Sequence, residues 1–276
     1  SRLKHDSLIQ VLGISSDDVQ TTIITEYLSG GSLAEQMLSP VDPRKAFEWG
    51  RQMAEALAFA HRNRIFHGNL RPSNVLFDEF GAVKVSDFAL KPPALHKADQ
   101  DCYRHPALQG VALDMFALGA IIYHALTGRE PQFRNGRLMR SKVFTDQLPR
   151  VQEVVTRLLE TSEDRRYPTT EVVVAELRGV LRQLEENVEE QRKEVVQRKV
   201  AEVMRREEQI ARSGVPWKKW IVRSLLLLVI VEEAWFGFGW RTLQPWLSPY
   251  LQSAVQKVKA NESYIEWTDK TRRGGE

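Results

Sequence analysis

The chain has 276 residues, of which 42% are hydrophobic and 27% are charged, and its formal net charge is +3. This length predicts one or two domains with a sizeable core, and the nearly balanced charge gives no reason to expect nucleic acid as a partner. The single cysteine, Cys102, excludes an intramolecular disulfide framework or a Cys-rich zinc site and favours a reducing compartment.

Two β-rich runs open the chain, residues 3–13 and 21–27, with a polar turn at residues 15–18 between them. They predict an antiparallel pair of strands. Because an isolated two-stranded sheet is marginally stable, we expect residues 1–27 to belong to a larger sheet of a longer chain.

A helix is expected from Asp42 to His61. Asp42 followed by Pro43 is typical of a helix start. Apolar residues such as Phe47 and Met53 recur at helical spacing, so this helix should bury one face.

Residues 65–90 are the most informative stretch, because two short apolar runs, 74–77 and 83–85, flank a Gly-containing turn. This pattern predicts a β-hairpin, which brings its two outer ends together. Amide, guanidinium and carboxylate groups would then converge, as a site for a metal and a phosphate group requires. The polar side chains at these ends belong to His67, Asn69, Arg71, Asn74 and Asp87.

The stretch resembles the catalytic loop and metal-binding turn of a eukaryotic-type (Hanks) protein kinase, whose consensus is H-R-D-x-K-x-x-N followed by D-F-G. The spacing from His67 to Asn74 and on to Asp87 fits that consensus. Several letters differ: the chain has Gly68 and Asn69 for Arg-Asp, Arg71 for the lysine and Ala89 for the last glycine.

The replacement at Asn69 bears most directly on activity. In the family the aspartate accepts the proton of the substrate hydroxyl, which a neutral amide cannot do. Losing a positioned general base costs on the order of 100- to 10,000-fold in rate. The resemblance therefore implies a degenerate kinase, a pseudokinase, with Asn69 in place of the base and Arg71 in place of the lysine.

The resemblance also implies where a nucleotide would bind. Glu26, Leu28 and Leu76 would contact the cofactor through the hinge and the hairpin, and Asn74 and Asp87 are the Mg²⁺ ligands of the family pattern. The family's Gly-rich loop and strand lysine precede the part that matches here. We therefore expect an N-terminally truncated domain that binds ATP and Mg²⁺ only together with the missing small-lobe elements.

The activation segment of the family corresponds to residues 90–105, which contain no Ser or Thr, so that Tyr103 is the only hydroxyl-bearing residue there. The family's Ala-Pro-Glu glutamate has become Ala107, while its usual partner corresponds to Arg166. Because a buried unpaired guanidinium costs several kcal/mol, we expect Arg166 to be solvated or to meet another carboxylate.

Later segments match the large lobe in order and spacing. Residues 114–123 resemble its central hydrophobic helix, in which Asp114 accepts hydrogen bonds from the backbone of the catalytic loop. Residues 151–159 and 169–184 predict two further amphipathic helices.

Residues 184–212 form a highly charged helical pattern in which Val188 and Val195 continue a 3-4 apolar spacing. Two interpretations remain open. The helix is either a solvated strut or one strand of a coiled-coil homodimer.

The run 220–240 has the length of a bilayer span, with lysines before it and tryptophans at both ends. About eleven strongly apolar residues contribute roughly −5 kcal/mol to the free energy of membrane insertion, and two mid-span acids contribute about +5 kcal/mol. The total is therefore near zero. A tilted or partner-assisted span, an interfacial helix and a helix packed on protein all remain possible interpretations.

The sequence thus predicts an α+β, mostly α fold: a protein-kinase-like large lobe with a partial small lobe of two strands, a long C-terminal helix and a hydrophobic membrane-type segment. Its expected parts are a partial small lobe with the hinge (1–27), a kinase-like large lobe (28–183), a charged helical stalk or coiled coil (184–214), a Trp-rich transmembrane or interfacial segment (215–250) and a polar tail (251–276).

The leading hypothesis is an impaired pseudokinase, a cytoplasmic domain held at the membrane as a single-pass or peripheral protein, that acts as a scaffold or allosteric signalling partner for proteins the sequence does not identify. One alternative is a weakly active Ser/Thr kinase that transfers the γ-phosphate of ATP to protein. Another is an inert spacer for the stalk and membrane segment.

Overall fold

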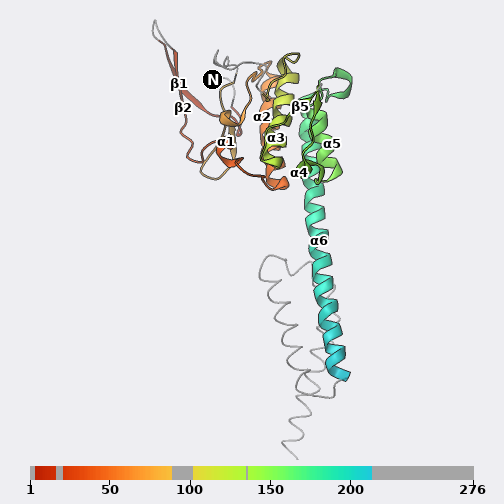
Figure 1. The fold of residues 1–276 in the computed structure, drawn as a ribbon. Coiled ribbons are helices and arrows are strands. Elements are labelled where there is room, and N and C mark those ends of the chain that lie inside the picture. Colours follow the sequence, from red (N-terminus) through yellow and green to blue (C-terminus); the bar gives the residue numbers. More distant parts are fainter. Residues whose placement is uncertain (1–3, 17–20, 89–101, 135, 213–276) are drawn as a thin grey trace, which may run out of the picture. The chain divides into compact units, whose positions relative to one another are not determined.

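The computed structural model describes residues 4–16, 21–88, 102–134 and 136–212, and the chain divides into two compact units, residues 1–190 and 191–276. The described part is mostly helical (Figure 1). In chain order its elements are β1 (Val11–Ser16), β2 (Thr21–Thr25), α1 (Leu33–Gln36), α2 (Pro43–Arg62), a 3-10 helix (Pro72–Asn74), β3 (Val75–Phe77), β4 (Val83–Val85), α3 (Gly110–Thr127), β5 (Phe133–Arg134), β6 (Arg137–Leu138), α4 (Lys142–Thr145), α5 (Pro149–Leu158), a second 3-10 helix (Glu163–Arg165) and α6 (Thr170–Arg212).

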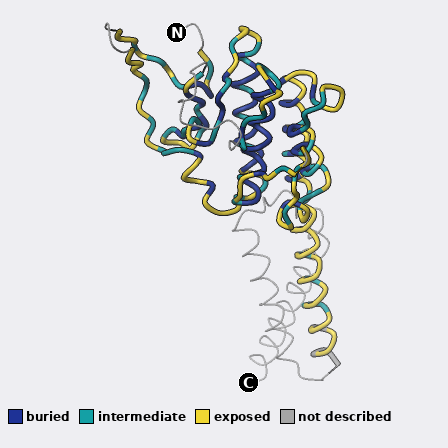
Figure 2. Tube along the Cα trace, turned by 45° about the horizontal axis from the view of Figure 1, so that its top comes forward, coloured by how far each residue is buried: buried dark blue, intermediate teal, exposed yellow. Residues whose placement is uncertain are grey.

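The core of the first unit forms around α3. This helix packs against α2 on one side and α5 on the other, and it is buried along most of its length (Figure 2). Close packing requires glycine at Gly119, where a β-carbon would lie 2.6 Å from Cβ of Leu158. Among the described residues, α3 alone has the length and composition of a membrane span, but 78% of it is buried inside the protein, as expected for a core helix.

Helix boundaries follow the local sequence signals. Asp42 caps α2, because its carboxylate accepts hydrogen bonds from the backbone N–H groups of Arg44 (3.0 Å) and Lys45 (3.2 Å). Gly128 ends α3 in the left-handed conformation with φ of 65°. The predicted helix start at residue 42 is therefore confirmed.

The first two strands form the predicted antiparallel pair, but the predicted bounds were wrong. β1 begins at Val11 and continues through Ser16, which pairs with Thr21, where a turn was expected. The preceding residues pair elsewhere: Leu8 forms a parallel bridge with Val85 of β4. Residues 7–9 thus extend the β3–β4 hairpin, which is why β1 starts late.

The sheet of β1 and β2 projects from the helical part of the first unit (Figure 1). Several of its large apolar side chains are exposed, namely those of Leu12, Ile14, Ile23 and Ile24. This sheet consequently buries little of its apolar surface against the rest of the described chain.

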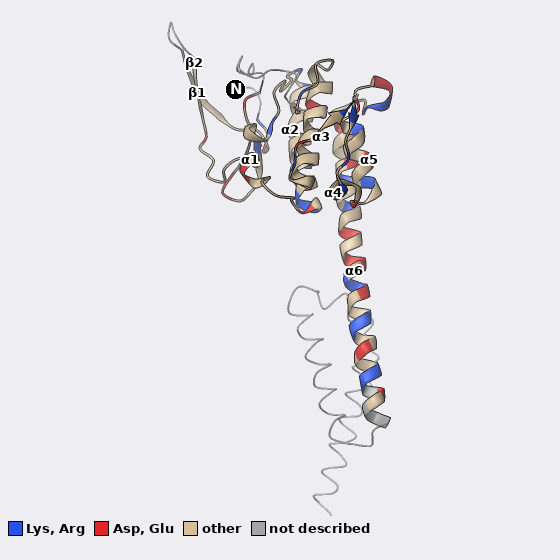
Figure 3. Cartoon of the chain, viewed as in Figure 1, with Lys and Arg blue, Asp and Glu red and all other residues tan. Residues whose placement is uncertain are grey.

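The two helical patterns expected at residues 169–184 and 184–212 form one unbroken helix, α6. Its first turns bury Val173, Leu177 and Val180, whereas most residues after Leu184 are exposed. Acidic and basic residues alternate along the exposed part (Figure 3). Residues 90–101 of the expected activation segment, the Trp-rich segment 215–250 and the tail 251–276 lie outside the described residues.

Candidate functional site

The β3–β4 hairpin brings together the two ends of the stretch that the sequence singled out. Val75 pairs with Val85 in antiparallel register. Just beyond this pair, the backbone N–H of Ser86 donates to the carbonyl of Asn74 at 2.9 Å. Asn74 and Asp87 therefore lie at the same end of the hairpin, as predicted.

The catalytic-loop amide is part of a local hydrogen-bond network. Asn69 is 8% exposed, and its Oδ1 accepts a hydrogen bond from Nε of Arg71 at 3.2 Å. Its backbone carbonyl accepts from Nδ2 of Asn74 at 3.0 Å. Asn69 thus forms hydrogen bonds with both Arg71 and Asn74, the two other polar residues that the sequence assigned to this loop.

Asp87 presents an exposed carboxylate at the end of β4. Its backbone has a φ of 59°, a left-handed conformation that aspartate tolerates better than most residues. Oγ of Ser86 donates to Oδ2 of Asp87 at 3.4 Å. Residues held in such sparsely populated conformations are concentrated at functional sites.

A buried carboxylate holds the start of the loop. Asp114 of α3 is fully buried and accepts hydrogen bonds from the backbone N–H groups of His67 and Gly68, both at 2.8 Å. This confirms the predicted contact between Asp114 and the catalytic loop. Nε2 of His61, at the end of α2, also lies 2.8 Å from Asp114 Oδ2, while its Nδ1 lies 2.7 Å from Oγ1 of Thr170 on α6.

His67 is a packing residue. Its ring lies 4.6 Å from that of Phe88, centroid to centroid, and within the described part of the chain its Nε2 has no hydrogen-bond partner. Burial lowers the pKa of the His67 imidazole, while the carboxylates of Asp114 and Asp87 act in the opposite direction. The expected stacking of His67 on Phe88 is confirmed.

The expected hinge, residues 26–28, lies against the β3–β4 hairpin. Glu26 exchanges two hydrogen bonds with Gln10, one through its backbone N–H (2.9 Å) and one through its carboxylate (2.8 Å). The same carboxylate lies 3.7 Å from Nζ of Lys84 on β4. Leu28 and Leu76, the two apolar residues assigned to the cofactor, are both half-buried.

Two contacts of the loop were missed by sequence reasoning. Nη1 of Arg104 donates to the carbonyl of Gly68 at 2.8 Å, and His61 contacts Asp114. The chain has Gly68 where the family has arginine, which indicated that another cation could form hydrogen bonds with the loop. Nothing in the local sequence points to His61, because its partner is 53 residues away.

Of the two alternatives expected for Arg166, solvation or a contact with another carboxylate, the structure shows the first. The residue is half-buried, and its Nη1 donates to the backbone carbonyl of Thr161 at 3.3 Å. The guanidinium therefore avoids the cost of a buried unpaired charge.

The donor set of Asn74 and Asp87 fits Mg²⁺. Asn74 uses its NH₂ group toward Asn69. Its amide oxygen accepts a long hydrogen bond, 3.4 Å, from Oγ of Ser73 and keeps a second lone pair for a ligand, and carboxylate and amide oxygens suit this cation. No group of three or more His, Cys, Asp or Glu that could hold a metal occurs in the described residues. Two protein ligands fit a magnesium ion that takes its other ligands from phosphates and water.

A catalytic loop anchored by a buried aspartate, followed by a hairpin with an amide and a carboxylate at one end, defines the large lobe of a kinase-like protein. The protein kinase domain model matches residues 1–204. The chain belongs to the protein kinase family.

Three similar proteins carry the name of a Ser/Thr kinase. The chain is similar to CBL-interacting serine/threonine-protein kinase 21 of Arabidopsis thaliana (31% identical over 147 residues, 47% of this chain and 34% of the relative). It is also similar to serine/threonine-protein kinase PrkC of Bacillus subtilis strain 168 (32% over 146 residues, 48% and 22%), and to CBL-interacting serine/threonine-protein kinase 19 of Arabidopsis thaliana (27% over 200 residues, 62% and 41%). The chain spans less than half the length of each of these relatives.

Proposed function

We propose that this chain is a catalytically impaired protein kinase homologue that acts in signalling as a scaffold or allosteric partner. The observation that carries the proposal is the amide of Asn69 at the position of the family's base. Its Oδ1 accepts a hydrogen bond from Nε of Arg71. The side chain at the position that would have to take up a proton from a substrate hydroxyl is therefore an amide that forms a hydrogen bond within the loop.

The rate argument follows from the chemistry of the amide. A side-chain amide has no lone pair basic enough to accept a proton near neutral pH, so the contribution of general-base catalysis, on the order of 100- to 10,000-fold, is lost. Binding and orientation of a nucleotide do not depend on that base. Impaired transfer is therefore compatible with retained binding.

Binding of Mg-ATP by the complete protein is part of the proposal. Bound Mg-ATP supplies the transferable phosphoryl group and the metal charge that stabilises its transfer. In this chain Asn74 and Asp87 would hold the metal. Arg71 would neutralise phosphate, with Glu26, Leu28 and Leu76 at the base-binding side of the cleft.

A phosphotransfer assay on the full-length protein tests this function. With radiolabelled ATP and a generic protein substrate, we expect wild-type turnover to equal that of Asp87→Ala. Asn69→Asp should raise turnover by about 100-fold or more if the base alone is missing. Wild-type turnover that is lost in Asp87→Ala would contradict the proposal.

The same assay decides the second candidate, a weakly active Ser/Thr kinase. Its support is that both metal-ligating residue types remain at one end of the hairpin and that the relatives named above are Ser/Thr kinases. The third interpretation, an inert spacer, predicts no change in melting temperature on addition of Mg-ATP. A shift that is absent in Asp87→Ala would argue against that interpretation.

We further propose that the kinase-like lobe works on the cytoplasmic side of a membrane. The support is the sequence of residues 215–250 alone: an apolar run with lysines before it and tryptophans at both ends. Extraction of cell membranes with alkaline carbonate tests this. A spanning segment stays in the membrane pellet, a peripheral one is released, and a chain found only in the soluble fraction before extraction would contradict the proposal.

A homodimer through residues 184–212 is the proposed assembly. Val188 and Val195 are 45% and 50% exposed on α6 and are seven residues apart, the repeat of a coiled coil. Light scattering on Val188→Lys/Val195→Lys should show a monomer where the wild type is a dimer. Val172→Lys, at an exposed position of the same helix outside the proposed seam, is the matched control.

A further inference from the structure

A hydrogen-bonded path leads from the start of α6 to the catalytic loop. Oγ1 of Thr170, the first residue of α6, lies 2.7 Å from Nδ1 of His61. Nε2 of the same ring lies 2.8 Å from Oδ2 of Asp114. The carboxylate of Asp114 in turn accepts the backbone N–H groups of His67 and Gly68. The first turn of α6 is therefore connected to the loop through α2 and α3.

The acceptor at one end of the path fixes the direction of its hydrogen bonds. A carboxylate only accepts, so the imidazole of His61 donates to Asp114 through Nε2. In the neutral ring Nδ1 is then an acceptor, and the hydroxyl of Thr170 is its donor. The hydroxyl thus holds the ring in the orientation in which it can donate to Asp114.

Burial excludes a role of these three side chains in catalysis. A hydroxyl, an imidazole and a carboxylate also form the nucleophilic triad of hydrolases. Here Thr170 is 1% exposed, Asp114 is fully buried and the side chain of His61 is 6% exposed. Because no substrate can reach the hydroxyl, the path can act only through the positions of its members.

The register of α6 against α2 is set by charge. Three ion pairs join the two helices: Arg62 with Glu171 at 3.3 Å, Glu55 with Arg178 at 2.7 Å and Arg44 with Glu185 at 2.8 Å. The three members on α6 are spaced seven residues apart and alternate in sign. A shift of α6 by seven residues would place like charges opposite each other. Exposed pairs of this kind add little to stability, but together they favour the register that keeps Thr170 beside His61.

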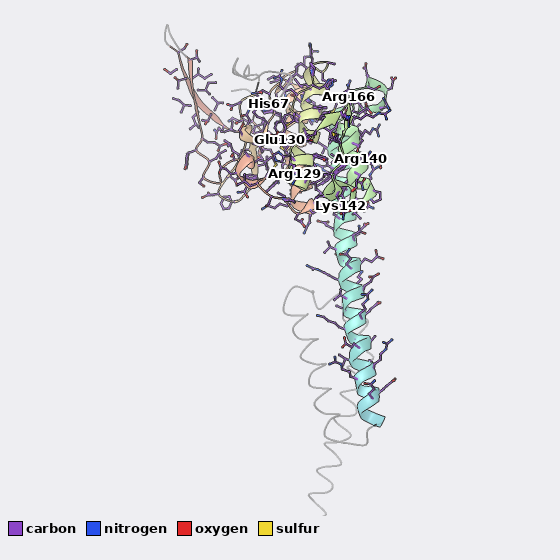
Figure 4. All side chains as sticks on the ribbon, in the orientation of Figure 1. His67, Arg129, Glu130, Arg140, Lys142 and Arg166 are labelled. Carbon is purple, nitrogen blue, oxygen red and sulfur yellow. The ribbon has the colours of Figure 1, made fainter. Side chains whose placement is uncertain are left out.

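The other end of the path reaches a residue assigned to the metal. Next to the anchored N–H groups, the backbone carbonyl of Asn69 accepts a hydrogen bond from Nδ2 of Asn74 at 3.0 Å. In the view of Figure 4, His67 lies to the left of α3, toward β1 and β2, and α6 lies to its right. An effect of α6 on Asn74 therefore has to cross the helices between them, as the hydrogen-bonded path does.

We propose that Thr170 is a positioning residue for the catalytic loop. It holds His61, and through it Asp114, in the arrangement that places the loop and the metal ligand Asn74. The inference rests on the proposed binding of Mg-ATP and adds the start of α6 to the elements on which that binding depends. The effect on the loop needs no nucleotide, so it can be measured separately from binding.

The test compares the full-length protein with Thr170→Val, which keeps the shape of the side chain and removes the hydroxyl. Hydrogen exchange in residues 66–71, measured without nucleotide, should become about two- to tenfold faster, the effect of one lost hydrogen bond. The affinity for Mg-ATP, measured by isothermal titration calorimetry, should fall by a similar factor. Thr170→Ser keeps a hydroxyl and should restore both values.

Thr127→Val is the matched control. Thr127 is also a buried threonine, at the other end of α3 from Asp114, and its hydroxyl donates to the carbonyl of Tyr123 at 2.8 Å. This variant should lower the melting temperature and leave exchange in residues 66–71 unchanged. His61→Phe keeps a ring beside Phe66 and removes both hydrogen bonds, so that adding Thr170→Val to it should cause no further change in exchange.

Unchanged exchange in Thr170→Val, or equal acceleration in Thr127→Val, would overturn the inference. So would an unchanged affinity of Thr170→Val if the wild type binds Mg-ATP. A different result separates the two proposals: if the wild type binds no Mg-ATP while Thr170→Val still accelerates exchange in the loop, the proposed nucleotide binding fails and the positioning of the loop by Thr170 stands.

Discussion

Oδ2 of Asp114 accepts the backbone N–H of His67 at 2.8 Å, although the two residues are 47 positions apart in the chain. Oδ1 of the same carboxylate accepts the N–H of Gly68 at 2.8 Å. Both donors sit at the start of the catalytic loop, and the carboxylate is fully buried. The central helix thus fixes the loop through its backbone, which makes the fixation independent of the loop's catalytic side chains.

The first prediction concerns this carboxylate. Asp114→Asn should lower the free energy of unfolding by about 1–3 kcal/mol, because one backbone N–H would then face an NH₂ donor and remain unsatisfied. Urea denaturation measures the change. Asp146→Asn, at an exposed position after α4, should change stability by less than about 0.5 kcal/mol. Equal effects of the two substitutions would contradict the anchoring role.

The second prediction is a pH dependence of stability. Burial lowers the folded-state pKa of His67 and also that of His124. Below the ordinary histidine pKa of about 6.5, the unfolded chain therefore binds protons that the native chain does not. This contribution to stability is complete above that pH and declines as the pH falls toward the depressed folded-state pKa.

Urea denaturation between pH 7.5 and 5.5 should show the decline, with at most about 1.4 kcal/mol per pH unit from each histidine. His67→Phe keeps a ring for stacking on Phe88 and removes the titrating group, so its slope should be smaller than that of the wild type. Identical slopes would show that His67 does not contribute.

The third prediction concerns Arg104, which donates to the carbonyl of Gly68 at 2.8 Å. Arg104→Ala should remove a charge-assisted hydrogen bond and lower the free energy of unfolding by about 1–2 kcal/mol. Hydrogen exchange in residues 66–71 should become faster. Arg129→Ala, at an exposed arginine after α3, is the control and should leave exchange in that segment unchanged.

The fourth prediction compares two glycines. Gly119→Ala should destabilise the protein by about 1–3 kcal/mol, because the new methyl group would meet Cβ of Leu158 at 2.6 Å. Gly179→Ala on α6 meets nothing within 4 Å and should stabilise by about 0.5–1 kcal/mol through the higher helix propensity of alanine. Thermal melts of both variants check the opposite signs.

Elements defined by neighbouring residues could be predicted from the sequence. The β3–β4 hairpin follows from two apolar runs around a turn, and the start of α2 follows from Asp42 and Pro43, because turns and helix caps are decided by contacts over a few residues. The motif spacing from His67 to Asp87 likewise placed Asn74 and Asp87 at one end of the hairpin.

The tertiary structure alone decided which distant residues meet. Residues 7–9 pair with β4, Arg104 reaches the carbonyl of Gly68, and Arg157 rests on the ring of Tyr167. No period or spacing in the sequence encodes these contacts, because each depends on how helices and loops pack around α3. The same packing brings Arg140 and Arg157, which are far apart in the chain, into the lining of one groove, which composition and net charge could not reveal.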